Sequence, residues 1–115
     1  MKSVVCLLLL ATVCSCSIFS SKPKCKSGNH FMGNEYDLPK NVVAAIQRNE
    51  KAKATLENGM ALVLQITEDG NTFYVADVAS TETGRHVHLK LSSDFDKTEA
   101  LDEKKFEKYT HCKEA

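Results

Sequence analysis

Two histidines, His86 and His88, are the residues of this sequence whose type and spacing best suit chemistry. They alternate with apolar residues in the segment from Arg85 to Ser92, so in a strand both imidazoles point to the same side. Imidazole nitrogens are common ligands of zinc and copper, and two of them on one strand supply half of such a site. His30 and His111 could complete it if the fold brings them near. The alternative is that both are surface histidines on the exposed face of a strand.

The cysteines suggest a second kind of chemistry, a disulfide. Of the five cysteines, Cys25 and Cys112 lie near the two ends of the chain that follows the N-terminal apolar run. A bridge between them would close a very long loop, for which chain entropy gives about 4–5 kcal/mol, comparable with the stability of a small domain. The sequence has no Cys-x-x-Cys spacing, so we favour a structural disulfide over a redox-active or metal-binding pair.

Motifs for covalent or phosphate chemistry are not evident in the sequence. It contains neither Gly-x-Ser-x-Gly nor a Gly-rich phosphate-binding loop. The acidic pairs Glu68-Asp69 and Asp94/Asp96 suit turn and helix-cap positions better than acid–base catalysis. We therefore expect a protein that is not an enzyme, with no cofactor and no small-molecule substrate.

The first fifteen residues have the pattern of a secretory signal peptide. Met1-Lys2-Ser3 supplies a basic start, and Val4 to Val13 is an uncharged apolar run of about ten residues. This run is too short to span a bilayer, which requires roughly 20 apolar residues. We therefore expect the protein to be exported and residues 1–15 to be removed.

The end of the apolar run carries a further signal. Ser15 precedes Cys16, and Val13 stands two places before Ser15. This arrangement resembles a bacterial lipoprotein signal, in which cleavage before the cysteine leaves a lipid on its sulfur; Cys14 departs from the Ala, Ser or Thr usual at that position. The resemblance implies that Cys16 is lipidated and attaches the protein to an envelope membrane. The alternative is a secreted form, cut by an ordinary signal peptidase after Ser15 or Ser17.

The charge balance limits the choice of partners. The chain has 15 basic and 15 acidic residues, and removal of Lys2 with the signal leaves a net charge close to −1. Nucleic-acid-binding proteins normally carry a basic excess, so we expect no nucleic-acid partner. The same balance argues against electrostatic attachment to anionic lipid, so contact with the membrane would depend on the lipid on Cys16.

The hydrophobic pattern predicts an α+β fold behind this leader. Residues 16–36 are rich in Ser, Lys, Gly and Asn, and we expect a tether followed by an irregular segment. The folded domain is expected over 37–115. Helical periodicity predicts a helix over 39–57, ended by Asn58-Gly59, and a second helix over 94–109. Alternation predicts three strands between them, over 60–67, 72–79 and 85–92.

Turn signals arrange these strands. Asp69-Gly70 and the segment from Ser80 to Gly84 predict that the three strands form an antiparallel meander. The predicted fold is therefore helix, three-stranded antiparallel β-meander and C-terminal helix, with one disulfide. The middle strand is apolar on both faces, so a face left uncovered by the helices would suit docking of a protein partner.

These features together predict a small exported, lipid-anchored envelope protein that acts as a non-enzymatic binding or scaffold module with a protein partner. Its expected location is the cell envelope, at the periplasmic or surface face of the outer membrane. The alternative is a secreted or surface-anchored inhibitor or immunity factor that blocks an external protein with the loop from Ser80 to Gly84. A third hypothesis is a metal-binding envelope protein that uses His86 and His88.

Overall fold

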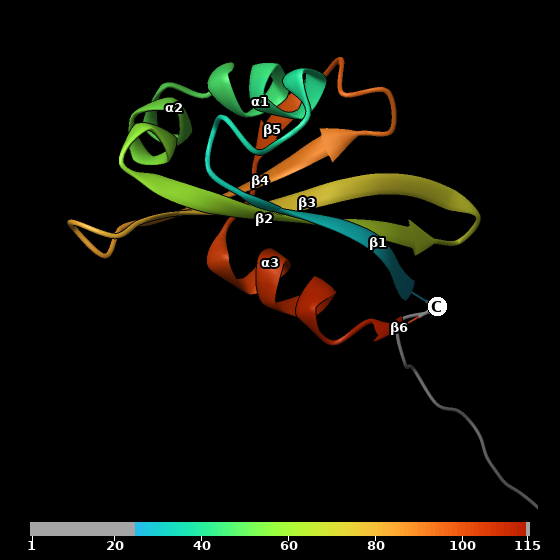
Figure 1. Cartoon of the computed structure of the whole chain (residues 1–115). Coiled ribbons are helices and arrows are strands. Elements are labelled where there is room, and N and C mark those ends of the chain that lie inside the picture. The colour runs from blue at the N-terminus through green and yellow to red at the C-terminus, as the bar shows by residue number, and fades with distance from the viewer. Residues whose placement is uncertain (1–24, 115) are drawn as a thin grey trace, which may run out of the picture.

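A six-stranded sheet runs through the centre of the protein and has helices on both of its faces (Figure 1). This computed structural model describes residues 25–114. The strands are β1 (Cys25–Gly33), β2 (Gly59–Glu68), β3 (Asn71–Ser80), β4 (His86–Ser92), β5 (Thr98–Ala100) and β6 (Lys113–Glu114). The helices are α1 (Lys40–Gln47), α2 (Glu50–Glu57) and α3 (Glu103–Thr110). The predicted α+β class is therefore confirmed.

The predicted meander is confirmed as β2, β3 and β4 at the centre of the sheet. The strand order is β5-β4-β3-β2-β1-β6, antiparallel except for the short pairing of β1 with β6. The turn between β2 and β3 places Asp69 and Gly70 at φ angles of 52° and 81°. This is the left-handed region that a two-residue hairpin turn requires and that Asp-Gly favours. The prediction of three strands is wrong, because β1, β5 and β6 extend the sheet on both sides.

One face of the sheet is covered by α1 and α2. The helices bury an apolar stripe at helical spacing, and Val42, Ile46 and Leu56 have at most 1% of their surface exposed. Burying a side chain of this size contributes roughly 1.5–3 kcal/mol, so this face carries the larger share of hydrophobic stabilisation. The core contains Leu38, Val42, Ala45, Ile46, Ala52, Leu56, Ala61, Val63, Ala76, Val78, Leu89, Leu91 and Phe95.

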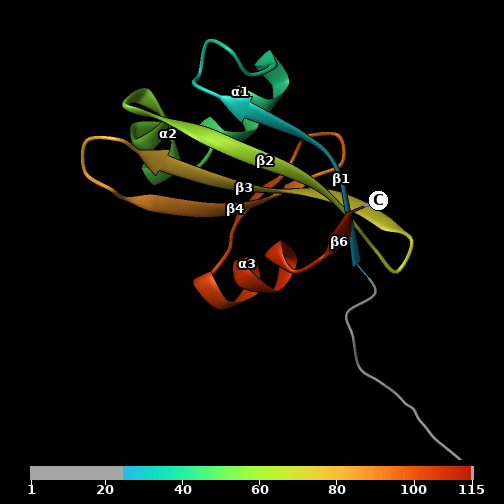
Figure 2. The ribbon, with the colours of Figure 1, turned by 60° about the horizontal axis from the view of Figure 1, so that its bottom comes forward.

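The opposite face is covered in part by α3, as Figure 2 shows. A smaller cluster forms there, in which the rings of Phe73 and Tyr109 meet edge to face with centroids 5.3 Å apart. Its buried members are Cys25, Ile66, Phe73, Val75 and Tyr109. The apolar residues of β3 are therefore covered on both faces, and the docking face expected on this strand is not exposed.

The helix predicted over 39–57 is divided into two, which corrects the prediction. Asn49 lies between them as the N-cap of α2, and its side-chain oxygen accepts a hydrogen bond from the amide of Ala52 at 2.9 Å. The Arg48 guanidinium donates to the carbonyl oxygen of Phe95 at 2.7 Å, which joins the bend to the segment between β4 and β5. Asparagine competes with helical hydrogen bonding and favours caps, which accounts for the break between the two helices at Asn49.

The segment from Cys25 to Gly33 is strand β1, although it was predicted to be irregular. It pairs with β2 from Cys25 opposite Glu68 to Gly33 opposite Ala61, with a register shift between Ser27 and His30. Gly, Ser and Asn are poor strand formers, which is why composition predicted a loop. Pairing with the long strand β2 overrides this local preference.

The second predicted helix, over 94–109, begins nine residues later than expected, at Glu103. In its place, the carboxylate of Asp94 accepts a hydrogen bond from the amide of Asp96 at 3.0 Å and forms a turn in which Phe95 has a φ of 61°. A residue in this left-handed region does not start a helix. The chain then forms β5 along β4, and Asp102 caps α3 instead.

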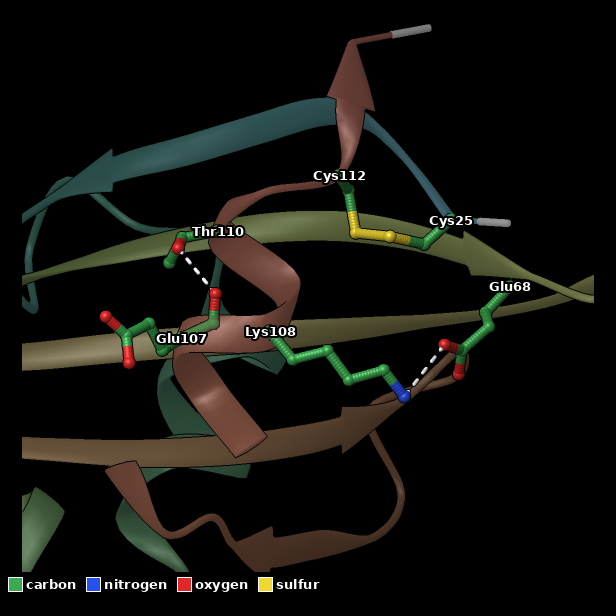
Figure 3. The surroundings of a disulfide bond; sticks show 6 residues. All are labelled: Cys25, Glu68, Glu107, Lys108, Thr110 and Cys112. Atoms are coloured by element: carbon green, nitrogen blue, oxygen red, sulfur yellow. Dashed lines mark hydrogen bonds and ion pairs between the residues drawn. A yellow bond between two sulfur atoms is a disulfide. The ribbon is translucent and has the colours of Figure 1, made fainter. Parts of the chain in front are cut away.

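A disulfide between Cys25 and Cys112 joins the two ends of the described chain, as predicted (Figure 3). The sulfur atoms are 2.07 Å apart, and the bond closes a sequence separation of 87. Beside it, the Lys108 ammonium lies 3.2 Å from a carboxylate oxygen of Glu68. Because Cys25 is opposite Glu68 in the sheet, both chain ends lie next to the turn between β2 and β3.

The predictions on export and anchoring fall outside the described residues. They concern the signal peptide over 1–15, the lipidated Cys16 and the tether that leads to Cys25. Among residues 25–114, no helix combines the length and the apolar character needed to cross a bilayer.

Candidate functional site

Three side chains converge on the face of the sheet that α3 covers in part. Asp77 of β3 has its Oδ1 atom 3.0 Å from Nδ1 of His86 and 3.4 Å from Nε2 of His88, both on β4. The three candidate ligand atoms all lie within 4.8 Å of one another. The two predicted histidines are thus brought together with a carboxylate, and the set is of a kind that can hold a cation.

The hairpin of β3 and β4 positions this cluster. Asp77 lies directly opposite His88, and Ala79 lies opposite His86. Because side chains alternate across a strand, all four project from the same face of the sheet. Sequence reasoning had not identified Asp77 as part of the site.

The three side chains differ in how firmly they are held. The exposed fraction of the side chain is 16% for His88, 25% for Asp77 and 54% for His86. The ring of His88 stacks on the ring of Phe106 from α3, with centroids 3.9 Å apart and an interplanar angle of 3°. Packing therefore sets the orientation of His88, whereas His86 lies at the solvent side of the cluster.

Two open hollows meet at the histidines. The first, of about 390 Å³, lies between both histidines and the beginnings of α2 and α3. The second, of about 340 Å³, lies between both histidines and the side chains of Phe106 and Glu107 on α3. Glu103 lines both hollows. Water and small ions can therefore reach the cluster from two sides, and the carboxylates of Glu103 and Glu107 favour cations in the second hollow, while Lys51 also lines the first.

The other two histidines considered from the sequence are not part of this cluster. His30 lies on β1, which β2 and β3 separate from the histidines of β4. His111 is the C-cap of α3, more than one helical turn beyond Phe106. The disulfide joins Cys25 to Cys112, but His30 lies opposite Leu64 in the middle of β2.

The loop from Ser80 to Arg85 joins the two strands of the site and is well ordered by hydrogen bonds. The buried Ser80 hydroxyl accepts bonds from the amides of Glu82 and Thr83 at 3.2 and 3.3 Å. The amide of Ser80 donates to the Arg85 carbonyl at 2.9 Å. The side chains of the loop residues 81–85 are exposed, so the loop presents a preformed polar surface beside the cluster.

An exposed apolar strip adjoins the cluster on the same face. Met32 and Met60 have 63% and 44% of their surface exposed. Met60 is opposite Ala79, and Met32 is opposite Leu62, which is in turn opposite Asp77. We call this area the distal surface; it consists of Met32, Met60, Leu62, Asp77, His86 and His88.

Comparison with known proteins gives no relative from which a role could be transferred. No protein family, no curated protein and no solved structure matches this chain.

Proposed function

We propose that this chain is a small exported, lipid-anchored protein of the cell envelope that acts as a non-enzymatic binding module for another protein. The anchor is the lipid on Cys16, which follows from the signal pattern at Val13 to Cys16. The binding face is the distal surface. Neither a nucleic acid nor a small-molecule substrate is part of the proposal.

The observation that carries the proposal is the exposed apolar strip of the distal surface. α1 and α2 cover one face of the sheet. On the other face, α3 covers the part that contains Ile66, Phe73 and Val75. Met32 and Met60 remain exposed on the latter face. Flexible methionine side chains at an exposed patch are typical of surfaces that bind other proteins.

The position of this strip relative to the tether supports the same role. The tether would enter at Cys25, beside the turn between β2 and β3. The distal surface lies toward the other end of these strands, next to the loop between β3 and β4 (Figure 1). A strand of ten residues is roughly 30 Å long, so a membrane-anchored protein would hold this surface away from its anchor.

The alternative function is a secreted or surface-anchored inhibitor or immunity factor that blocks an external protein. One observation favours it: the loop of exposed residues 81–85 is held by hydrogen bonds to the buried Ser80 before any partner binds. Loops ordered in advance lose little entropy on binding, which raises affinity.

The anchor is tested by the intact mass of the protein recovered from envelopes of the producing cell. A chain that begins at Cys16 and carries added acyl chains is the expected result. A chain that begins at Ile18 without added mass would contradict anchoring and would leave the secreted form.

The binding face is tested by photo-cross-linking in intact cells. A photoreactive residue at Met60 is compared with one at Tyr36, which is 87% exposed and lies outside the distal surface. The expected result is a discrete cross-linked protein from position 60 and none from position 36. Equal cross-linking from both positions, or none from either, would contradict the proposed surface. A third probe at Thr83 tests the inhibitor, which should cross-link an external protein through the loop.

A further inference from the structure

We propose that Asp77, His86 and His88 bind a divalent transition-metal ion, with Zn²⁺ as the ion of best fit. This extends the proposed binding function, since it gives the distal surface an inorganic ligand in addition to a protein partner. It does not depend on the lipid anchor. Two imidazole nitrogens and one carboxylate oxygen are a donor set that zinc accepts, and the set leaves one coordination position open.

The distances are close to those of a metal site before the metal binds. With bonds of about 2.1 Å, two ligand atoms of a tetrahedral zinc ion are about 3.4 Å apart. The distance from Asp77 Oδ1 to His88 Nε2 is already 3.4 Å, and that to His86 Nδ1 is 3.0 Å. No pair of these atoms is more than 4.8 Å apart, so the remaining adjustment is on the order of 1 Å. His86 is the exposed member and can make this adjustment by rotation of its side chain.

The surroundings favour a bound cation over the single hydrogen bond between His86 and Asp77. Both imidazoles approach the same carboxylate oxygen, Oδ1 of Asp77. An exposed hydrogen bond of this kind contributes little to stability, whereas an ion at the meeting point would use all three atoms as ligands. Lys90, the next residue on this face of β4, directs its ammonium over the Phe73 ring at 4.6 Å from the centroid. Its charge therefore lies over the core of this face.

The site is organised before binding by its neighbours. The stacking of His88 on Phe106 fixes the ring plane, and the strand pairing of β3 with β4 fixes the backbone of all three ligands. The two hollows leave the fourth position open to water; Glu103 and Glu107 make the second hollow acidic, whereas Glu103 is offset by Lys51 in the first. A site with three protein ligands and one open position can exchange its ion or accept a donor atom from a partner.

Isothermal titration of ZnCl₂ into the exported protein, without a histidine tag and with its disulfide formed, tests the site. The wild type should bind one Zn²⁺ per chain. His88→Ala should weaken binding by about 100-fold or more, since even second-shell changes cost 10–100-fold. Asp77→Asn keeps the shape of the side chain and should weaken binding by about tenfold or more. His111→Ala, which removes an exposed histidine outside the cluster, is the matched control and should bind as the wild type does.

A second measurement separates loss of ligands from loss of fold. Zn²⁺ in excess should raise the unfolding temperature of the wild type and of His111→Ala, because an ion that binds the folded state stabilises it. It should raise that of His88→Ala much less, because this variant binds Zn²⁺ more weakly, and the metal-free variant should still unfold cooperatively. Absence of Zn²⁺ binding by the wild type would overturn the site, as would equal affinity of the wild type and Asp77→Asn. Cross-linking from position 60 without zinc affinity would contradict the metal site and leave the proposed protein-binding function. Zinc affinity without cross-linking would support the metal site and contradict the protein-binding surface.

Discussion

At the scale of single residues, Asp77 determines what the two histidines of β4 can do. Imidazoles two positions apart on a strand share a direction, but on their own they supply only two ligand atoms. The Asp77 carboxylate lies within 3.4 Å of both rings and adds a third ligand atom and a negative charge. The cluster therefore exists because β3 carries its one acidic residue at this register.

The clearest stability prediction for a single residue concerns Gly59, at the start of β2. A Cβ atom at this position would fall on the backbone of the neighbouring strand, against the Ala79 carbonyl and 2.8 Å from Cα of Ser80. Gly59→Ala should therefore lower the free energy of unfolding by about 2–3 kcal/mol, measured by urea denaturation, because backbone must move to make room.

Gly28→Ala is the matched control for this prediction. Its Cβ atom would meet only the side chain of Gln65, at 2.9 Å from Oε1, and that side chain can rotate away. We expect a loss of about 1 kcal/mol or less. Equal losses for the two variants would show that close backbone approach at Gly59 is not the cause.

Tyr109 gives a prediction on alkaline pH. Burial raises the pKa of its phenol above the ordinary value of 10.0, and the nearby Glu68 charge acts in the same direction. A raised pKa in the folded state means that the unfolded chain releases the proton first, so the contribution is complete below pH 10 and is lost as the pH rises through the folded pKa. The hydrogen bond and charge of Glu68 also raise the pKa of Lys108. Its contribution to stability is therefore lost in the same direction, as the pH rises.

Tyr109→Phe keeps the ring beside Phe73 and removes the titrating group. We expect the free energy of unfolding to fall less steeply above pH 10 in this variant than in the wild type, measured by urea denaturation at a series of pH values. Tyr36→Phe, at a tyrosine that is 87% exposed, serves as control and should follow the wild type. Identical slopes for Tyr109→Phe and the wild type would contradict a role for phenol burial.

The candidate site could be predicted from the sequence only in part. Alternation of apolar residues in β4 is complete, so the common direction of His86 and His88 follows from the pattern. Asp77 enters the site through the register between β3 and β4, and a shift of one residue would turn its side chain to the other face. The longer loop between these strands does not fix that register as the Asp69-Gly70 turn fixes the register of β2 with β3.

At the scale of elements, the bend between α1 and α2 is held by hydrogen bonds to the segment between β4 and β5 and to the start of β5. The Arg48 guanidinium donates to the carbonyl of Phe95 at 2.7 Å, and the Thr98 hydroxyl donates to the carbonyl of Ala45 at 2.6 Å. These two bonds satisfy carbonyls at the end of α1 and in the turn before β5. They join two segments that are about fifty residues apart in the sequence.

Arg48→Ala should lower the free energy of unfolding by about 1–2 kcal/mol, because it removes a charge-assisted hydrogen bond to a partly buried carbonyl. The measurement is urea denaturation of the variant against the wild type. Arg85→Ala, which removes an arginine from the exposed loop between β3 and β4, is the matched control and should change stability by less than about 0.5 kcal/mol. An equally large loss for Arg85→Ala would contradict the attribution of the Arg48→Ala effect to the hydrogen bond with Phe95.

Local pattern predicted the elements well where it was regular and failed where tertiary contacts decide. The meander was predicted because its strands alternate and its first turn contains Asp-Gly. The break at Asn49 and the left-handed Phe95 depend on capping and on the contact with Arg48, which no local pattern specifies. β1 and β5 depend on pairing with β2 and β4, and pairing overrides the weak strand preference of their residues.

At the scale of the whole molecule, the disulfide completes an otherwise small second layer. Five buried residues form the cluster under α3, whereas thirteen form the core under α1 and α2. Cys25 and Tyr109 are members of the smaller cluster, and the Lys108–Glu68 ion pair lies beside it. The attachment of α3 and of the two ends of the described chain therefore depends in part on the cross-link. The cysteine pair was visible in the sequence because the two residues stand near the ends of the domain.

Cys25→Ser combined with Cys112→Ser should lower the free energy of unfolding by about 4 kcal/mol, since the bond closes a sequence separation of 87 and long loops lose most chain entropy in the unfolded state. The effect should also be local. Hydrogen exchange should become fastest in α3, in β6 and at the start of β1, while α1, α2 and the centre of the meander keep their protection because their core is separate. Chemical reduction of the wild type should reproduce both results. A uniform rise in exchange across the sheet would mean instead that the two layers unfold as one unit and that the cross-link stabilises the protein only through the unfolded chain.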